Sequence, residues 1–164
     1  MAIRPIIRFP DPRLRVAAQP VTRFDAELHA VAGDLLDTMR AAPGVGITAP
    51  HLGVPLRLVV LELAPADVRV YVNPTVLEVS AETIRHVEGS VSMPGVNDEI
   101  ERSARVTIGY RDLDGVEHTE TAEGFRAACH QHEIDQLDGI FWIDRLSRLK
   151  RDRLIARYNK LRRV

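Results

Sequence analysis

Cysteine, aromatic residues and long apolar runs are scarce in this chain of 164 residues. The single cysteine, Cys129, excludes an internal disulfide, which suits a reducing compartment and predicts a cytoplasmic protein. No run of about 18 apolar residues is present, so we expect no membrane span. The N-terminal stretch lacks an apolar segment and is interrupted by Pro5, Pro10 and Pro12, which argues against a signal peptide.

The remaining composition is that of a folded domain, with 45% hydrophobic residues and a net charge of −1. This length and composition predict a single domain over residues 1–164. The charge is unevenly placed, because residues 145–164 carry nine Lys and Arg side chains and one acid, Asp152. We therefore expect a basic C-terminal helix over 144–164, with a cationic surface on an otherwise acidic body.

Apolar periodicity predicts three helices and several strands without a βαβ alternation, which indicates an α+β fold. The first helix begins at an Asp25 N-cap and ends before Pro43-Gly44. The second covers 123–139, and the third runs from 144 to about 162. Strands are predicted at 57–63, 69–72, 75–79, 104–110 and 117–121, and residues 88–92 should lie at a strand edge.

The most informative stretch is the second helix, EGFRAACHQHEIDQLDG at 123–139. Its spacing places Phe125, Ala128, Cys129, His132 and Gln136 on one face. An imidazole followed directly by a carboxylate, as in His132-Glu133, is how a helix presents a metal ligand beside a general base. The usual form of this device has a second histidine four residues later, where this chain has Gln136. Alone, such a histidine is more often a core or surface residue than a ligand.

Two further stretches give the helix a context: GVGITAPHLG at 44–53 and EGSVSMPG at 88–95. In this order and spacing, the three stretches resemble the peptide deformylase motifs GxGxAAxQ, EGCxS and QHExDHxxG. The resemblance covers nearly the whole chain. It implies the deformylase fold, with antiparallel or mixed sheets around a central helix carrying His132-Glu133, plus a C-terminal helix. It also implies hydrolysis of the formyl group from N-formylmethionyl peptides.

The resemblance implies roles for particular residues. In the family, one cysteine and two histidines hold a divalent metal, usually Fe²⁺ or a substitute such as Zn²⁺ or Ni²⁺. The corresponding ligand positions here are Ser90, His132 and Gln136. Glu133 takes the place of the base, and the Val91 N–H group and the His51 side chain take the place of the oxyanion donors. The peptide-binding positions are Gly44, Val45, Gly46 and Gly89. Thr48 replaces the usual alanine, and His51 replaces the usual glutamine.

These departures weaken the metal site, because a serine hydroxyl and a glutamine carbonyl are poor substitutes for thiolate and imidazole. Three interpretations follow: a relic site that binds no metal, a site rebuilt with His51, His132 and Ser90, or a metal-free pair in which Ser90 is hydrogen-bonded to His132. The matching functions are a hydrolase of N-formyl or N-acyl groups, and a binding protein that pairs a peptide with 44–47 and 89–91. A third is a ribosome or RNA contact through the basic helix. The resemblance also predicts an ion pair between Glu88 and Arg102.

Overall fold

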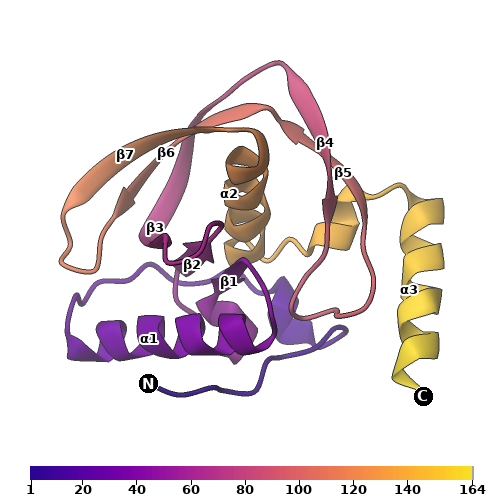
Figure 1. Cartoon of the computed structure of the whole chain (residues 1–164), viewed down its shortest axis with the longest axis horizontal. Coiled ribbons are helices and arrows are strands. Elements are labelled where there is room, and N and C mark those ends of the chain that lie inside the picture. The colour runs from indigo at the N-terminus through magenta and orange to yellow at the C-terminus, as the bar shows by residue number, and fades with distance from the viewer. Residues whose placement is uncertain (164) are drawn as a thin grey trace.

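The computed structural model describes residues 1–163, which fold into two antiparallel sheets and three helices (Figure 1). The larger sheet has the strand order β1-β2-β3-β6-β7, and β4 pairs with β5 in a separate ribbon. The strands are β1 (Gly46–Thr48), β2 (Leu58–Glu62), β3 (Val68–Val79), β4 (Thr83–Glu88), β5 (Asp98–Ser103), β6 (Arg105–Arg111) and β7 (Glu117–Glu123). The helices are α1 (Ala26–Ala41), α2 (Gly124–Leu137) and α3 (Arg148–Arg162), with short 3₁₀ turns η1 (Pro12–Arg15), η2 (Ala49–Leu52) and η3 (Trp142–Arg145).

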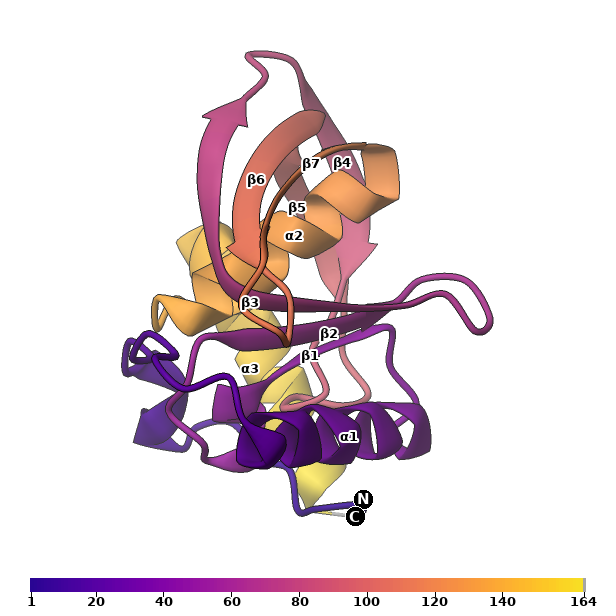
Figure 2. The ribbon, with the colours of Figure 1, turned by 90° about the vertical axis from the view of Figure 1, so that its left-hand side faces the viewer.

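The predicted α+β class and the central position of α2 are confirmed. Figure 2 shows α1 on one side of β1 and β2 and α2 on the other. The buried strand β2 serves both layers, because Leu58 and Val60 pack with α1 whereas Val59 and Leu61 pack in the cluster that includes α2. The alternation of side chains along a strand produces this arrangement. The helix that carries His132 is therefore held on a rigid, two-sided scaffold.

Local capping chemistry sets the helix boundaries. The Asp25 side chain accepts the Leu28 N–H group at 3.1 Å, as predicted, and so begins α1. At the end of α2, Gly139 has a φ of +79°, and a Cβ atom there would lie 2.6 Å from the Arg15 carbonyl oxygen. Only glycine fits such a close approach in this backbone conformation. The chain can therefore turn away sharply just beyond the functional face of α2.

The third helix starts later than predicted, at Arg148 and not at 144. The Ser147 side chain accepts the Lys150 N–H group and caps the helix, while residues 142–145 form the turn η3. Leu154 and Tyr158 bury α3 against a cluster that includes Trp142. Leu161, one turn further along α3, is about half exposed. Val164, at the end of the predicted basic segment, lies outside the described residues.

The strands predicted at 69–72 and 75–79 form one continuous strand, β3. Asn73 adopts a φ of +50°, and its amide group bonds both backbone polar groups of Val21 at 2.8 and 2.9 Å. The β3–β6 register shifts between Val72 and Thr75. Pro74, which has no N–H group to donate, therefore falls in the irregular part of the ladder.

The ribbon of β4 and β5 ends where the expected active-site motif begins. Strand β4 stops at Glu88, so residues 89–91 form a loop just beyond the strand. The sequence had placed residues 88–92 at a strand edge without giving the bounds of the strand. Strand β5 was not predicted, because its buried positions are Ile100 and the charged Arg102. Within the described residues, no helix combines the length and apolar character needed to cross a bilayer.

Candidate ligand-binding site

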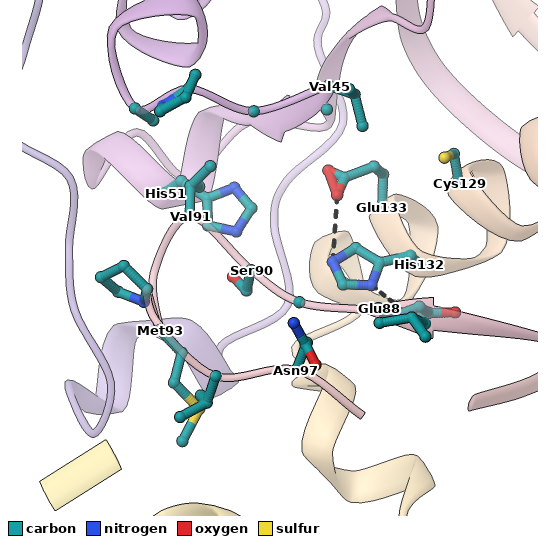
Figure 3. A pocket seen from close by; sticks show the side chains of 18 of the residues that line it. Val45, His51, Glu88, Ser90, Val91, Met93, Asn97, Cys129, His132 and Glu133 are labelled. Carbon is teal, nitrogen blue, oxygen red and sulfur yellow. Dashed lines mark hydrogen bonds and ion pairs between the residues drawn. The ribbon is translucent and has the colours of Figure 1, made fainter. Parts of the chain in front are cut away.

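A pocket of about 490 Å³ opens between the segment leading into β1, the loop after β4, and α2 (Figure 3). Strand β1 lies at the edge of the larger sheet, so one side of its backbone is not paired with another strand of that sheet. Nine of the ten residues assigned by resemblance line this pocket: Gly44, Val45, Gly46, His51, Gly89, Ser90, Val91, His132 and Glu133. Segments far apart in sequence therefore converge as the motifs suggested.

Gln136 is the exception among the ten. It is buried on α2, and its amide nitrogen donates to the Leu14 carbonyl group at 2.7 Å. It is not among the pocket-lining residues of the described chain. The side chain at this ligand position thus links α2 to η1.

His51 is held by the residue that caps its own 3₁₀ turn. The Thr48 N–H group donates to Nδ1 of His51 at 2.9 Å, and the Thr48 hydroxyl oxygen lies 3.0 Å from the same nitrogen. Because a backbone N–H group can only donate, Nδ1 must carry a lone pair and a neutral ring must carry its proton on Nε2. Burial, together with the nearby charge of His132, lowers the pKa of His51 to about 3. The ring is therefore neutral at physiological pH.

His132 has a carboxylate at each ring nitrogen. Its Nδ1–H group donates to Glu88 at 2.7 Å, and its Nε2 lies 3.4 Å from Glu133 Oε1. Burial opposes the charged imidazolium, but the Glu88 hydrogen bond and the two carboxylates outweigh it and raise the pKa of His132. Burial raises the pKa of Glu133.

Glu88 in turn belongs to a buried chain of charges. Arg102 donates to both Glu88 oxygens at 2.9 Å, which confirms the predicted ion pair. Arg102 also donates to Asp135 at 2.6 Å, and Asp135 receives a second guanidinium from Arg145. Burial raises the pKa of Glu88, but Arg102 and His132 overcome it and hold the value at about 2. Glu88 is therefore ionised and orients the His132 ring.

The hydrogen bond between Ser90 and His132 that the metal-free interpretation requires does not form. Ser90 Oγ accepts the Ser92 N–H group at 3.0 Å, whereas both His132 nitrogens face carboxylates. Carboxylates are stronger acceptors for an imidazole N–H group than a neutral hydroxyl. The metal-free interpretation of a serine nucleophile activated by His132 therefore has no support in this geometry.

The donor set does not fit the family's metal. Of the three ligand positions, only His132 offers a strong donor, since Ser90 presents a hydroxyl group and Gln136 is bonded to Leu14. His51 does not replace the missing ligands, because its lone pair points to Thr48 and its proton is on the pocket side. A ligating histidine instead donates its second ring nitrogen to an acceptor. Within residues 1–163, no three His, Cys, Asp or Glu side chains form a group that could hold a metal ion.

Two buried polar atoms at the inner end of the pocket have no partner within the described residues: Nε2 of His51 and Oε2 of Glu133. Their residues are 1% and 4% exposed. Figure 3 shows His51, Glu133 and His132 grouped around this end. Buried polar groups are normally paired, so the two atoms mark a place where a ligand would be accommodated. The sequence indicated both residues by resemblance, but gave no sign that Thr48 fixes the tautomer of His51.

Comparisons with known proteins identify the family. The family model for polypeptide deformylase matches residues 3–152. A Brucella suis protein named peptide deformylase-like is 63% identical over 99% of this chain and 100% of its own length. A second Brucella suis protein, named peptide deformylase, is 42% identical over 98% of this chain and 94% of its own length. This chain belongs to the polypeptide deformylase family.

Solved structures agree with this assignment. A Legionella pneumophila peptide deformylase superimposes with a TM-score of 0.94 and 40% identity, covering 99% of this chain and 96% of that one. A peptide deformylase from Ehrlichia chaffeensis in complex with actinonin gives a TM-score of 0.92 and 32% identity over the whole of both chains. The predicted deformylase fold is therefore confirmed.

Proposed function

We propose that this protein binds the N-terminal part of N-formylated or N-acylated peptides in the pocket and does not carry out the family's metal-dependent hydrolysis. The observation that carries the proposal is the contrast within one site. Within residues 1–163, two buried polar atoms that line the pocket are unpaired, while two of the three ligand positions lack strong metal donors. The pocket is thus suited to a bound peptide. It offers too few donor atoms to hold the metal ion that the family's hydrolysis requires.

The residues that line the pocket suit an extended peptide. The free side of β1 offers backbone groups that pair with an added strand, and Gly44, Gly46 and Gly89 allow its backbone to approach closely. Three exposed apolar side chains, Val45, Val87 and Phe125, also line the pocket and suit an apolar side chain of the ligand. The actinonin complex of the Ehrlichia chaffeensis deformylase supports ligand binding by a chain of this fold.

Under this proposal, the cell that makes this protein also has a separate, active deformylase. Brucella suis has a protein named peptide deformylase-like, 63% identical to this chain, and a protein named peptide deformylase, 42% identical to it. A paralogue that does not have to carry out deformylation can retain peptide binding after it has lost the metal-coordinating side chains that hydrolysis requires. The predicted cytoplasmic location is part of this proposal.

Calorimetry with formyl-Met-Ala-Ser, together with a formate-release assay and metal analysis of protein purified without chelator, tests the proposal. We expect peptide binding, no formate release above background, and less than stoichiometric transition metal. Val45→Asp should weaken binding by about tenfold, since it removes apolar contact at the pocket. Val116→Asp is the matched control, because Val116 is also exposed but does not line the pocket. Stoichiometric metal with rapid formate release would show instead that the protein is an active deformylase.

A further inference from the structure

We infer that Arg8 binds a carboxylate at the rim of the pocket, so that the protein selects peptides that carry a negative charge beyond their first residue. This inference rests on the proposed peptide binding and specifies the charge of the part of the ligand that lies outside the buried end. The carboxylate is that of an acidic side chain or that of the C-terminus of a short peptide.

Arg8 is the one charged residue among the exposed residues of the described chain that line the pocket. The other exposed lining residues are small or apolar, apart from Asn97. The two carboxylates that line the pocket, those of Glu88 and Glu133, are buried, and Glu88 is paired with Arg102. The rim of the pocket therefore carries a positive charge that the interior does not neutralise.

Arg8 also differs from the other arginines of the N-terminal segment, because its side chain forms no hydrogen bond or ion pair within residues 1–163. The other three arginines of residues 1–15 each pair with an aspartate: Arg4 with Asp34, Arg13 with Asp11, and Arg15 with Asp144. Asp11, the acid nearest to Arg8 in sequence, bonds the Arg13 guanidinium through both carboxylate oxygens. The guanidinium of Arg8 is thus left for a ligand.

The backbone on both sides of Arg8 is fixed to the walls of the pocket. The Ile7 N–H group donates to the His51 carbonyl oxygen at 2.8 Å, and the Phe9 N–H group donates to the Ser92 carbonyl oxygen at 2.8 Å. Ile7 is buried, and Phe9 packs on aromatic residues of the same core cluster. Binding a carboxylate therefore requires ordering of the Arg8 side chain but not of its backbone, which keeps the entropic cost small.

Helix α3 brings a second cation close to Arg8. Arg162 donates to the carbonyl oxygen of Phe9 at 3.3 Å. The neighbouring Leu161 lies against the loop that lines the pocket, since a Cβ atom on Gly95 would be 3.1 Å from its Cδ1. Two cations at one rim attract an acidic ligand and repel a basic one.

The expected size of the preference follows from the exposure of Arg8. Arginine binds a carboxylate through two parallel hydrogen bonds, which are among the stronger contacts of a protein surface. Solvent screening and the ordering of a long side chain reduce this gain at an exposed position. We therefore expect acidic peptides to bind about three- to tenfold more tightly than neutral ones, and the preference to decrease as salt is added.

Calorimetry with five formylated peptides tests the inference. Formyl-Met-Ala-Ala-amide is the neutral reference. Formyl-Met-Asp-Ala-amide, formyl-Met-Ala-Asp-amide and formyl-Met-Ala-Ala with a free carboxylate place a negative charge at successive positions, and formyl-Met-Ala-Lys-amide carries a positive charge. At least one acidic peptide should bind about three- to tenfold more tightly than the reference, and the Lys peptide should bind most weakly. The acidic peptide that gains affinity shows whether the carboxylate belongs to a side chain or to the chain end.

Three variants assign the preference to Arg8. Arg8→Gln should abolish it, and Arg8→Glu should reverse it in favour of the Lys peptide. Arg23→Gln is the matched control and should leave the preference unchanged, because Arg23 is also exposed but does not line the pocket. All three variants should bind the neutral reference as wild type does and keep its melting temperature, which circular dichroism checks.

The outcomes separate this inference from the proposed function. If wild-type protein binds all five peptides with equal affinity, or if the preference survives in Arg8→Gln, the inference is overturned while peptide binding stands. Binding of none of the peptides would overturn the proposed function and the inference together.

Discussion

Replacing Arg102 with methionine should destabilise the fold by about 3–5 kcal/mol, because it leaves a buried ion network without its central cation. The Arg102 side chain is 4% exposed, and its three hydrogen bonds reach Glu88 and Asp135. The pKa of Glu88 gives a second measure of this network. Arg102 and His132 together lower this pKa from 4.5 to about 2, which corresponds to roughly 3 kcal/mol in favour of the ionised carboxylate in the folded state.

The same pKa determines how stability changes with pH. Because the pKa of Glu88 is lower in the folded state, its contribution is present above about pH 4.5 and is lost as the pH falls towards 2. Urea unfolding followed by circular dichroism, at neutral pH and at several acidic values, measures both effects. The Arg102→Met variant should unfold at a lower urea concentration near neutral pH, and the acid-dependent loss due to Glu88 should be smaller, because only His132 then lowers its pKa.

The ribbon of β4 and β5 provides the matched control. Arg85 and Glu101 lie 3.9 Å apart on the same two strands, but both side chains are about half exposed. Arg85→Met should therefore change stability by less than about 1 kcal/mol. If the two methionine variants unfold at the same urea concentration, the reasoning that burial makes the Arg102 network important is refuted.

Two further predictions concern the metal positions and the basic helix. The double variant Ser90→Cys, Gln136→His should retain Zn²⁺ after dialysis, since a thiolate and a second imidazole supply the missing donors. Elemental analysis beside wild type measures this, and a double variant free of metal would contradict the assignment of these ligand positions. We also propose that α3 contacts ribosomes or RNA: replacing four exposed cations by glutamine should reduce the slope of log K against log salt by about 3 in ribosome cosedimentation. These cations are Arg153, Arg157, Lys160 and Arg163. Equal pelleting of both proteins at every salt concentration would leave α3 a packing element only.

The three motifs lie around one pocket, but of the elements next to them, β1, β4 and α2, only α2 was predicted from the sequence with its bounds. Val45 precedes β1, Gly89 follows β4, and His132 lies on the face of α2 that its spacing indicated. Strand β5 was missed for a physical reason: one of its inward positions is Arg102, so the apolar alternation expected of a half-buried strand is absent. The ion pair that compensates for this burial involves Glu88, 14 residues earlier.

The hydrogen-bond directions were beyond reach from sequence. Whether His51 donates or accepts at the pocket depends on one backbone N–H group, that of Thr48, and not on residue type. Likewise, one of the three interpretations paired Ser90 with His132, because residues that share a metal lie close together. Each has a better partner nearby, namely the Ser92 N–H group and the Glu88 carboxylate.

The Glu88 carboxylate joins the interior of the protein to its pocket, since it pairs with Arg102 and also holds the His132 ring. A substitution at Glu88 would therefore be removed by selection for folding alone, whether or not the pocket performs chemistry. As long as the carboxylate stays, His132 remains oriented as if for catalysis. Finding Glu88 and Arg102 in a sequence of this family is thus a sign of an intact fold. Activity has to be judged from the other positions, those equivalent to Ser90 and Gln136, whose replacement leaves this network untouched.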